Sequence, residues 1–170
     1  LSGTGTLTTG VDVLVGTSAN DLFTAAAGTL NGGDVLTDPS TSDNDTLNAV
    51  YNATTITAAG TPTISGIENI NIDIDAFAGT ATTFDATNVT GATITLSSKK
   101  AGFDGQAGVD NAGANNVTAG TGIKDLTVAA LTTGSVDAGS ATTVAVEVDD
   151  AKSLTANLTV NGNVTDLLFS

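Results

Sequence analysis

The sequence contains no histidine and no cysteine, and it has only four lysine or arginine residues among 170. These residue types supply most general bases, nucleophiles and transition-metal ligands in proteins. Their scarcity leaves few routes to catalysis, and hydrolysis by a pair of carboxylates is the main one that remains. The missing cysteines also remove disulfide bonds as a means of bracing the fold.

Large apolar side chains are scarce too. Methionine and tryptophan are absent, and aromatic residues make up 4% of a chain that is 40% apolar. No apolar run approaches the roughly 20 residues needed to cross a bilayer. The first residues, Leu1 to Thr4, lack the charged and apolar regions of a signal peptide. We therefore expect no membrane insertion, and a chain of this length is sufficient for one domain or one rod-like repeat segment.

Acidic residues dominate the charge. Asp and Glu number 18, the formal net charge is −14, and Glu68 and Glu147 are the only glutamates. Nucleic-acid binding requires neutralisation of phosphates by Lys and Arg, so this composition argues against a nucleic-acid partner. Aspartates beside Gly and Asn in turns are a different matter, because they offer the short, hard oxygen ligands that Ca²⁺ prefers.

Apolar residues alternate with Thr, Asn or Asp along much of the chain, which is the period-two pattern of β-strands. In Ile70 to Ile74, for example, three isoleucines share one face. Thr24 to Gly28, with three alanines, is the one stretch compatible with a short helical turn. The predicted strands are Asp12–Val15, Thr46–Val50, Asn69–Ile74, Thr93–Ser97, Asp125–Ala129, Thr143–Val148 and Leu154–Val160.

Between residues 64 and 170 the strand-like segments return at intervals of about 10 to 25 residues, which is typical of an all-β solenoid with irregular rungs. A β-sandwich gives a similar spacing of turns and is the alternative. The scarcity of aromatic anchors favours the solenoid. We expect residues 1–50 to form a segment rich in Gly-Asp and Asn-Asp turns, and residues 51–170 to continue it within one structural domain.

The most specific motif is a tandem with a nine-residue offset. Gly10 to Leu14 and Ala19 to Phe23 both match the second half of a Gly-Gly-x-Gly-x-Asp-x-apolar-x nonapeptide, the calcium β-roll repeat. A third copy begins at Gly32 and resumes at Asp43 after an insertion around Pro39. A fourth, Gly105 to Ala112, has Gln106 at the second glycine position.

The order of these motifs resembles that of calcium-binding surface-layer proteins of Gram-negative bacteria, which carry repeats of the RTX type. The resemblance covers residues 5–98 and rests on the segments 7–12, 16–23, 45–48, 64–72 and 84–91. It implies a right-handed parallel β-solenoid, a β-helix or β-roll, with Ca²⁺ bound at its turns. It also implies type I secretion and a non-catalytic structural protein of the cell surface that self-assembles into a layer or fibre, with cell-surface polysaccharide as a further candidate partner.

Transferred position by position, the repeat marks eight metal-ligand candidates. The complete and resumed copies give Asp12, Asn20, Asp21, Asp43 and Asp45, the interrupted copy adds Asp34 and Asp38, and the fourth copy adds Asp110.

Two other functions remain open at this stage. Thr-x-Thr pairs such as Thr55 to Thr57 and Thr93 to Thr95 suggest an ice- or surface-binding solenoid, although they recur at irregular intervals. A carbohydrate-active β-helix is the third possibility, with Glu68 and Glu147 as its carboxylate pair. Enzymes of that kind usually neutralise acidic substrates with clustered basic residues, and Lys99-Lys100 is the only such cluster.

Overall fold

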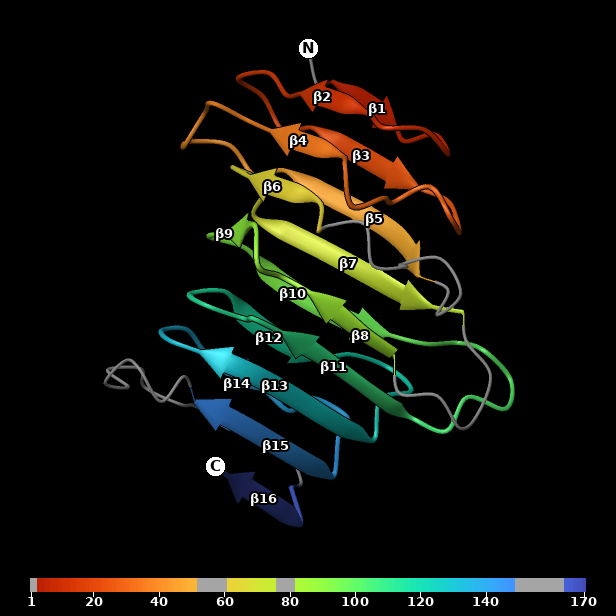
Figure 1. Cartoon of the computed structure of the whole chain (residues 1–170), viewed down its shortest axis with the longest axis vertical. Helices are drawn as coiled ribbons and strands as arrows, with labels where there is room; N and C mark the ends of the chain where they lie inside the picture. The colour runs from red at the N-terminus through yellow and green to blue at the C-terminus, as the bar shows by residue number, and fades with distance from the viewer. Residues whose placement is uncertain (1–2, 52–60, 76–81, 149–163) are drawn as a thin grey trace.

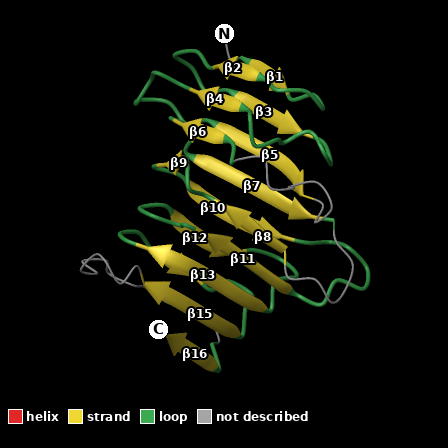
Figure 2. Cartoon of the chain, viewed as in Figure 1, coloured by secondary structure: helices red, strands yellow, loops and turns green. Residues whose placement is uncertain are grey.

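In a computed structural model, the chain forms a stack of parallel β-strands wound around a narrow apolar core (Figure 1). The structure describes residues 3–51, 61–75, 82–148 and 164–170. Strands and turns account for all regular structure in these ranges, and no helix occurs among them, so none of the described residues forms a helix that could span a membrane (Figure 2). The predicted all-β solenoid is confirmed.

Sheet A runs through most of the molecule. Its seven strands pair in parallel in the order β1 (Thr4–Thr6), β3 (Leu22–Ala25), β5 (Thr46–Tyr51), β7 (Asn69–Ile74), β10 (Thr93–Ser97), β12 (Asn116–Ala119) and β14 (Val136–Asp137). Strand β5 includes residue 50, so sheet A continues across the boundary between the two segments expected from the sequence.

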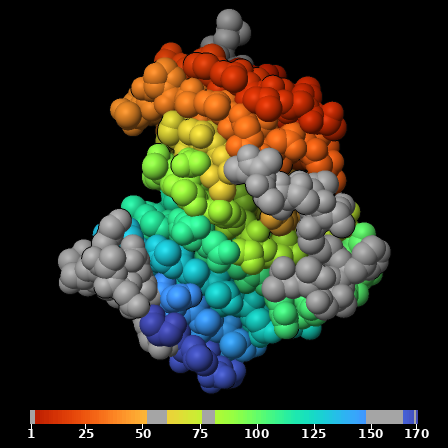
Figure 3. All heavy atoms as spheres, in the orientation of Figure 1, coloured from red at the N-terminus to blue at the C-terminus, as the bar shows by residue number. Residues whose placement is uncertain are grey.

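Two further sheets complete the winding. Sheet B contains β2 (Val13–Val15), β4 (Val35–Thr37), β6 (Thr63–Ser65) and β9 (Val89–Thr90). Sheet C contains β8 (Thr82–Asp85), β11 (Gln106–Asp110), β13 (Asp125–Leu131), β15 (Thr143–Val148) and β16 (Asp166–Phe169). The chain alternates between sheets A and B up to β7 and enters C at β8 and B at β9. It then alternates between A and C from β10 to β15, and β16 follows in C. Successive rungs therefore lie in sequence order along the long axis (Figure 3).

Alternation along each strand separates core from surface. In β7 the side chains of Ile70, Ile72 and Ile74 are at most 1% exposed, whereas those of Asn69, Asn71 and Asp73 point outward. Register stacks Ile70 beside Leu47 and Ile94, so each rung adds its aliphatic residues to one continuous core. Full burial of an aliphatic side chain contributes about 1.5–3 kcal/mol, and this internal column is the main source of stability.

The outer face of sheet A carries two columns of polar side chains, because strand positions two apart share a face. The first column comprises Thr4, Leu22, Thr46, Asn69, Thr93 and Asn116. The second column comprises Thr6, Thr24, Asn48, Asn71, Thr95 and Thr118. We refer to these twelve positions as the outer array.

Most predicted strands agree with the structure to within two residues, and Leu154–Val160 lies outside the described residues. The helical turn suggested for Thr24 to Gly28 is wrong. Thr24 and Ala25 belong to β3, and a turn closed by a hydrogen bond from Thr29 N–H to the Ala26 carbonyl follows. Gly28 adopts φ of 81° in this turn, a conformation that ends the strand and is favourable for glycine.

Candidate metal centre

Three aspartates meet where the chain passes from sheet B to sheet A. Asp21 directly precedes β3 and Asp45 directly precedes β5, and the two strands pair with Leu22 opposite Thr46. Asp38 directly follows β4 of sheet B. Parallel pairing therefore places Asp21 and Asp45 at the same end of neighbouring strands, while the turn after β4 brings Asp38 to the same corner.

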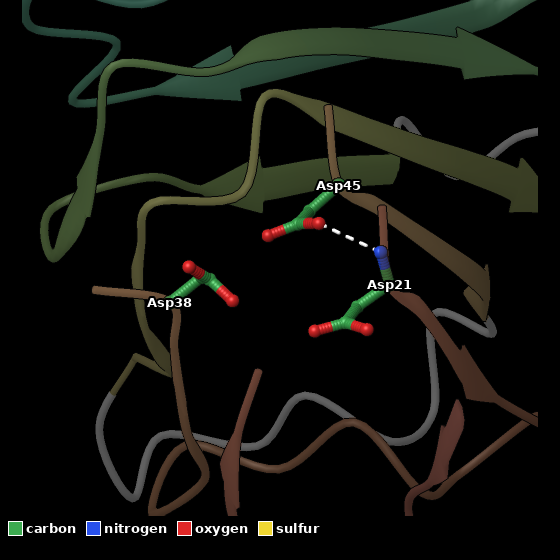
Figure 4. Close-up of side chains that lie close together, drawn as sticks. All are labelled: Asp21, Asp38 and Asp45. Carbon is green, nitrogen blue, oxygen red and sulfur yellow. Dashed lines mark hydrogen bonds between the residues drawn. The ribbon is translucent and has the colours of Figure 1, made fainter. Parts of the chain in front are cut away.

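The three carboxylates are buried and point toward one another (Figure 4). Relative exposure is 3% for Asp21, 7% for Asp38 and 0% for Asp45. One carboxylate oxygen from each residue lies within 4.8 Å of the others. We call these residues the aspartate triad.

Each carboxylate of the triad accepts hydrogen bonds, but these bonds use only some of its acceptor sites. The Asp21 carboxylate accepts from the backbone N–H groups of Gly3 and Thr17, and from the Thr17 hydroxyl at 3.1 Å. Asp45 Oδ1 accepts from the Asp21 backbone N–H at 2.7 Å, and Asp38 Oδ1 accepts from Ser40 N–H at 2.5 Å. These bonds orient the triad.

The second oxygens of two triad members have no partner. Asp38 Oδ2 and Asp45 Oδ2 are buried and accept no hydrogen bond. No lysine of the described residues forms an ion pair with the triad; Lys100 pairs with Asp75. A buried, unpartnered carboxylate oxygen costs several kcal/mol in a protein interior. Such oxygens require a partner that the described protein atoms do not supply, and a bound cation would provide one.

Two glycines make room for Asp38. A methyl group at Gly16 would overlap Asp38 Oδ2 and lie 2.7 Å from Asp21 Oδ2. Gly66, with φ of 70°, lies against the Asp38 backbone, where a methyl group would overlap the Asp38 carbonyl oxygen. The two carboxylates thus converge over a backbone position that has no side chain.

Electrostatics differ across the triad. Burial raises the pKa of Asp45. The hydrogen bond from Asp21 N–H opposes this rise, and the neighbouring charges of Asp38, Asp43 and Asp21 add to it. Burial acts in the same direction on Asp21, but hydrogen bonds from Thr17 and Gly3 hold the pKa of Asp21 below its ordinary value. The triad therefore concentrates negative charge that a cation would neutralise.

The donor set fits a hard cation. Carboxylates and carbonyls suit Ca²⁺, Mg²⁺ and Mn²⁺, whereas zinc and copper sites usually draw on His or Cys, which this chain lacks. Ca²⁺ takes 6–8 oxygen ligands in flexible geometry. The triad could hold a metal ion, with water and backbone carbonyls available to complete such a shell.

Two other predicted ligands serve as turn acceptors in the structure. Asp34 is fully buried and accepts from Asp12 N–H at 2.9 Å and from Asn31 N–H at 2.6 Å. Asp12 accepts from Thr8 N–H at 2.6 Å. Backbone N–H groups thus donate to both carboxylates, and neither residue belongs to the triad.

The remaining predicted ligands lie in three different settings. Both carboxylate oxygens of Asp43 are buried without a hydrogen-bond partner, two residues before Asp45. Asn20 is exposed, and its Oδ1 accepts from Asn44 N–H at 3.1 Å. Asp110 ends strand β11 in sheet C, opposite Asp85 of β8, so it belongs to a strand rather than to a calcium turn.

A ladder of side-chain acceptors along the start of sheet A was not predicted from the sequence. Glu68 Oε2 accepts from Asp45 N–H at 2.8 Å, as Asp45 does from Asp21 one rung earlier. Asn115, 1% exposed, repeats the contact by accepting from Ala92 N–H at 2.9 Å. The available signal is a polar residue directly before β3, β5, β7 and β12, whereas Ala92 stands at that position before β10.

Comparison with known proteins adds no relative to this description. A scan against protein-family models, a search of curated proteins and a search of solved structures each found no match. The parallel β-solenoid and the aspartate triad are therefore the features on which a function can be argued.

Proposed function

We propose that this chain is a non-catalytic, calcium-binding structural segment of an extracellular bacterial surface layer or fibre, which assembles by self-association. The observation that carries the proposal is the aspartate triad with its unpartnered buried oxygens on Asp38 and Asp45. The RTX-like motifs around Asp12 and Asp21 support calcium as the ion, and they support secretion by the type I route.

A bound ion would stabilise the winding itself. The triad draws one residue from each of the turns next to β3, β4 and β5, so a single cation would link two rungs of sheet A to sheet B. One Ca²⁺ would reduce three formal negative charges to one. The bound ion would thus stabilise the fold as disulfide bonds do in many secreted proteins, in a chain without cysteine.

The placement of the two glutamates supports a structural role over a carbohydrate-active one. Glu68 lies directly before β7 of sheet A and accepts a hydrogen bond from the Asp45 backbone. Glu147 lies in β15 of sheet C, eight strands later in the chain. Each residue belongs to a different wall of the solenoid.

An exposed apolar face on sheet B supports association. The outward side chains of Val13 and Val15 in β2 are 68% and 65% exposed. Packing of this face against a second copy of the chain is the mode of association that we propose.

Metal content and thermal melting test the first half of the proposal. The purified chain should contain calcium, and excess chelator should lower its melting temperature while magnesium at equal concentration restores it less. Dissociation constants of 10⁻⁴–10⁻³ M are sufficient for saturation outside cells. A metal-free protein whose melt is the same in chelator and in millimolar Ca²⁺ would refute calcium binding.

Light scattering and electron microscopy across a calcium titration test the second half. We expect assemblies to form as Ca²⁺ rises, and to be lost when Val13 on the apolar face of sheet B is replaced by Lys. A chain that stays monomeric at millimolar Ca²⁺ while degrading a polysaccharide would show that the structural assignment is wrong.

A further inference from the structure

The outer array turns an irregular sequence pattern into a regular surface. Its first-column positions are separated in the sequence by 18, 24, 23, 24 and 23 residues, because the turns between strands differ in length. Strand register removes this irregularity. Neighbouring rungs lie about 4.8 Å apart, and the two columns lie about 6.6 Å apart along each strand.

The array is uncharged in a molecule of net charge −14. Seven of its twelve positions are threonine, four are asparagine and one is Leu22. All twelve are exposed or partly exposed. Acidic side chains occur at its margins, as at Asp73 and Asp137, so the central strip presents hydroxyl, methyl and amide groups alone.

Contacts along the columns fix these groups in place. The hydroxyls of Thr6 and Thr24 lie 3.2 Å apart, and the Asn71 amide donates to Asn48 Oδ1 at 2.9 Å. At the far end the Ser135 hydroxyl donates to Asn116 Oδ1 at 2.9 Å. The β-branched threonines are also stiff at χ1, so an ordered partner would immobilise few additional rotamers.

The composition of the array selects among partner classes. Nucleic acid and anionic lipid require basic residues, and protein interfaces are enriched in Tyr, Trp, Met and Arg. Sites for organic ligands are lined mainly by apolar and aromatic side chains. The array contains no basic or aromatic residue and no Met, and Leu22 is its only large apolar side chain. It offers neutral hydrogen-bonding and methyl groups at a fixed repeat, which suits a partner that is itself a repeating lattice of hydrogen-bonding groups.

We infer that the outer array binds ordered water at the surface of ice. The inference goes beyond the proposed function and does not depend on assembly. The Thr-x-Thr pairs are irregularly spaced in the sequence, and Thr55 to Thr57 lies outside the described residues. The register of β1, β3, β5, β7, β10 and β12 nevertheless places the twelve positions of the array at a regular repeat, with Thr in both columns at β1 and β10.

The test uses the whole chain in millimolar Ca²⁺ and measures inhibition of ice recrystallisation and thermal hysteresis. Thr95→Lys inserts a long, charged side chain into the second column, and Thr127→Lys makes the same change at an exposed position on β13 of sheet C. Circular dichroism and melting confirm that both variants fold. We expect activity in the wild type and in Thr127→Lys, and its loss in Thr95→Lys.

Three results would overturn the inference. They are a folded wild type without activity on ice, equal loss of activity in the two variants, or a Thr95→Lys variant that keeps full activity. A wild type that is inactive on ice could instead bind dextran or form a dimer. If Thr95→Lys abolished that binding, the array would be assigned to the polysaccharide or to a second copy of the chain.

Discussion

Gly16→Ala provides the most direct test of the aspartate triad. The added methyl group would overlap Asp38 Oδ2 and lie 2.7 Å from Asp21 Oδ2, so at least one of these carboxylates must move. Overpacking of this kind costs about 1–3 kcal/mol. Without metal the carboxylates can turn away from the methyl group and recover part of that cost. With a cation bound they are held in place, so the penalty should be larger in Ca²⁺ than in chelator.

The expected size follows from binding linkage. At a free Ca²⁺ concentration of about 100 times the dissociation constant, the ion stabilises the fold by about 2.7 kcal/mol. For a chain of this length that corresponds to a rise in melting temperature of about 5–11 °C. A loss of about 1.4 kcal/mol weakens binding tenfold, which would cut the calcium-dependent rise to about half.

The assay combines isothermal titration with melts in chelator and in Ca²⁺, using Gly10→Ala as the matched control. Gly10 lies in the same N-terminal region, and the nearest atom to an added methyl group there is Thr8 Oγ1 at 3.6 Å, an ordinary contact. Wild-type calcium affinity in Gly16→Ala would refute the reasoning. So would a loss of stability that is the same in chelator and in Ca²⁺, because it would show that Gly16 serves packing alone.

Three other predictions follow from the structure. Asp21→Ala and Asp45→Ala should each weaken calcium binding at least about tenfold, whereas Asp137→Ala and Asp166→Ala should leave it unchanged. Titration calorimetry measures the calcium affinity of each variant. Equal affinities in all four variants would show that the calcium site is not the triad. Asn115→Ala should lower the free energy of unfolding by about 2 kcal/mol at any Ca²⁺ concentration, because it removes the acceptor of Ala92 N–H and the side-chain donor to the Val89 carbonyl, while the Ala112 carbonyl keeps its bond from the backbone N–H of residue 115. The exposed Asn48→Ala should cost far less in the same denaturant titration. Asp110→Asn should stabilise the fold at neutral pH by roughly a few tenths of a kcal/mol, because desolvation and the charges of Asp85 and Glu147 raise the pKa of Asp110, so its ionised form opposes folding, while solvent screens much of this effect at an exposed position. The gain should vanish as pH falls below about 4, where the wild-type carboxyl is protonated, and a gain that persists there would exclude a charge effect.

The strands could be predicted because their signal is local. Alternation in Asn69–Ile74 and Thr93–Ser97 reports which side chains face the core, and this pattern survives any change in turn length. The nonapeptide likewise identified Asp21 and Asp45 as residues directly before a strand. Whether a residue directly precedes a strand depends on the local sequence alone, so it can be predicted.

Contacts between rungs could not be predicted in the same way. Asp38 joins the triad because the turn after β4 folds back toward β3, and no local spacing specifies that path. The role of Gly16 depends on carboxylates 5 and 22 residues away in the sequence. Asp34, from the interrupted copy of the repeat, was also a ligand candidate, yet backbone donors engage both oxygens of its carboxylate while Asp45 retains an unpartnered oxygen. The sequence pattern identifies the residue type at a turn, and the neighbouring rung decides what that residue does.

The exchange of sheet B for sheet C has a mechanical consequence. Sheet B ends at β9 and sheet C begins at β8, so only sheet A joins the N-terminal rungs to the rungs around β12 and β14. Tension applied along the long axis would pass through the hydrogen bonds between successive strands of sheet A, and each rung would resist it mainly through its immediate neighbours. Extension should therefore proceed rung by rung, in small steps. The change of sheets around β7 to β10 divides the solenoid into two segments, which should extend independently.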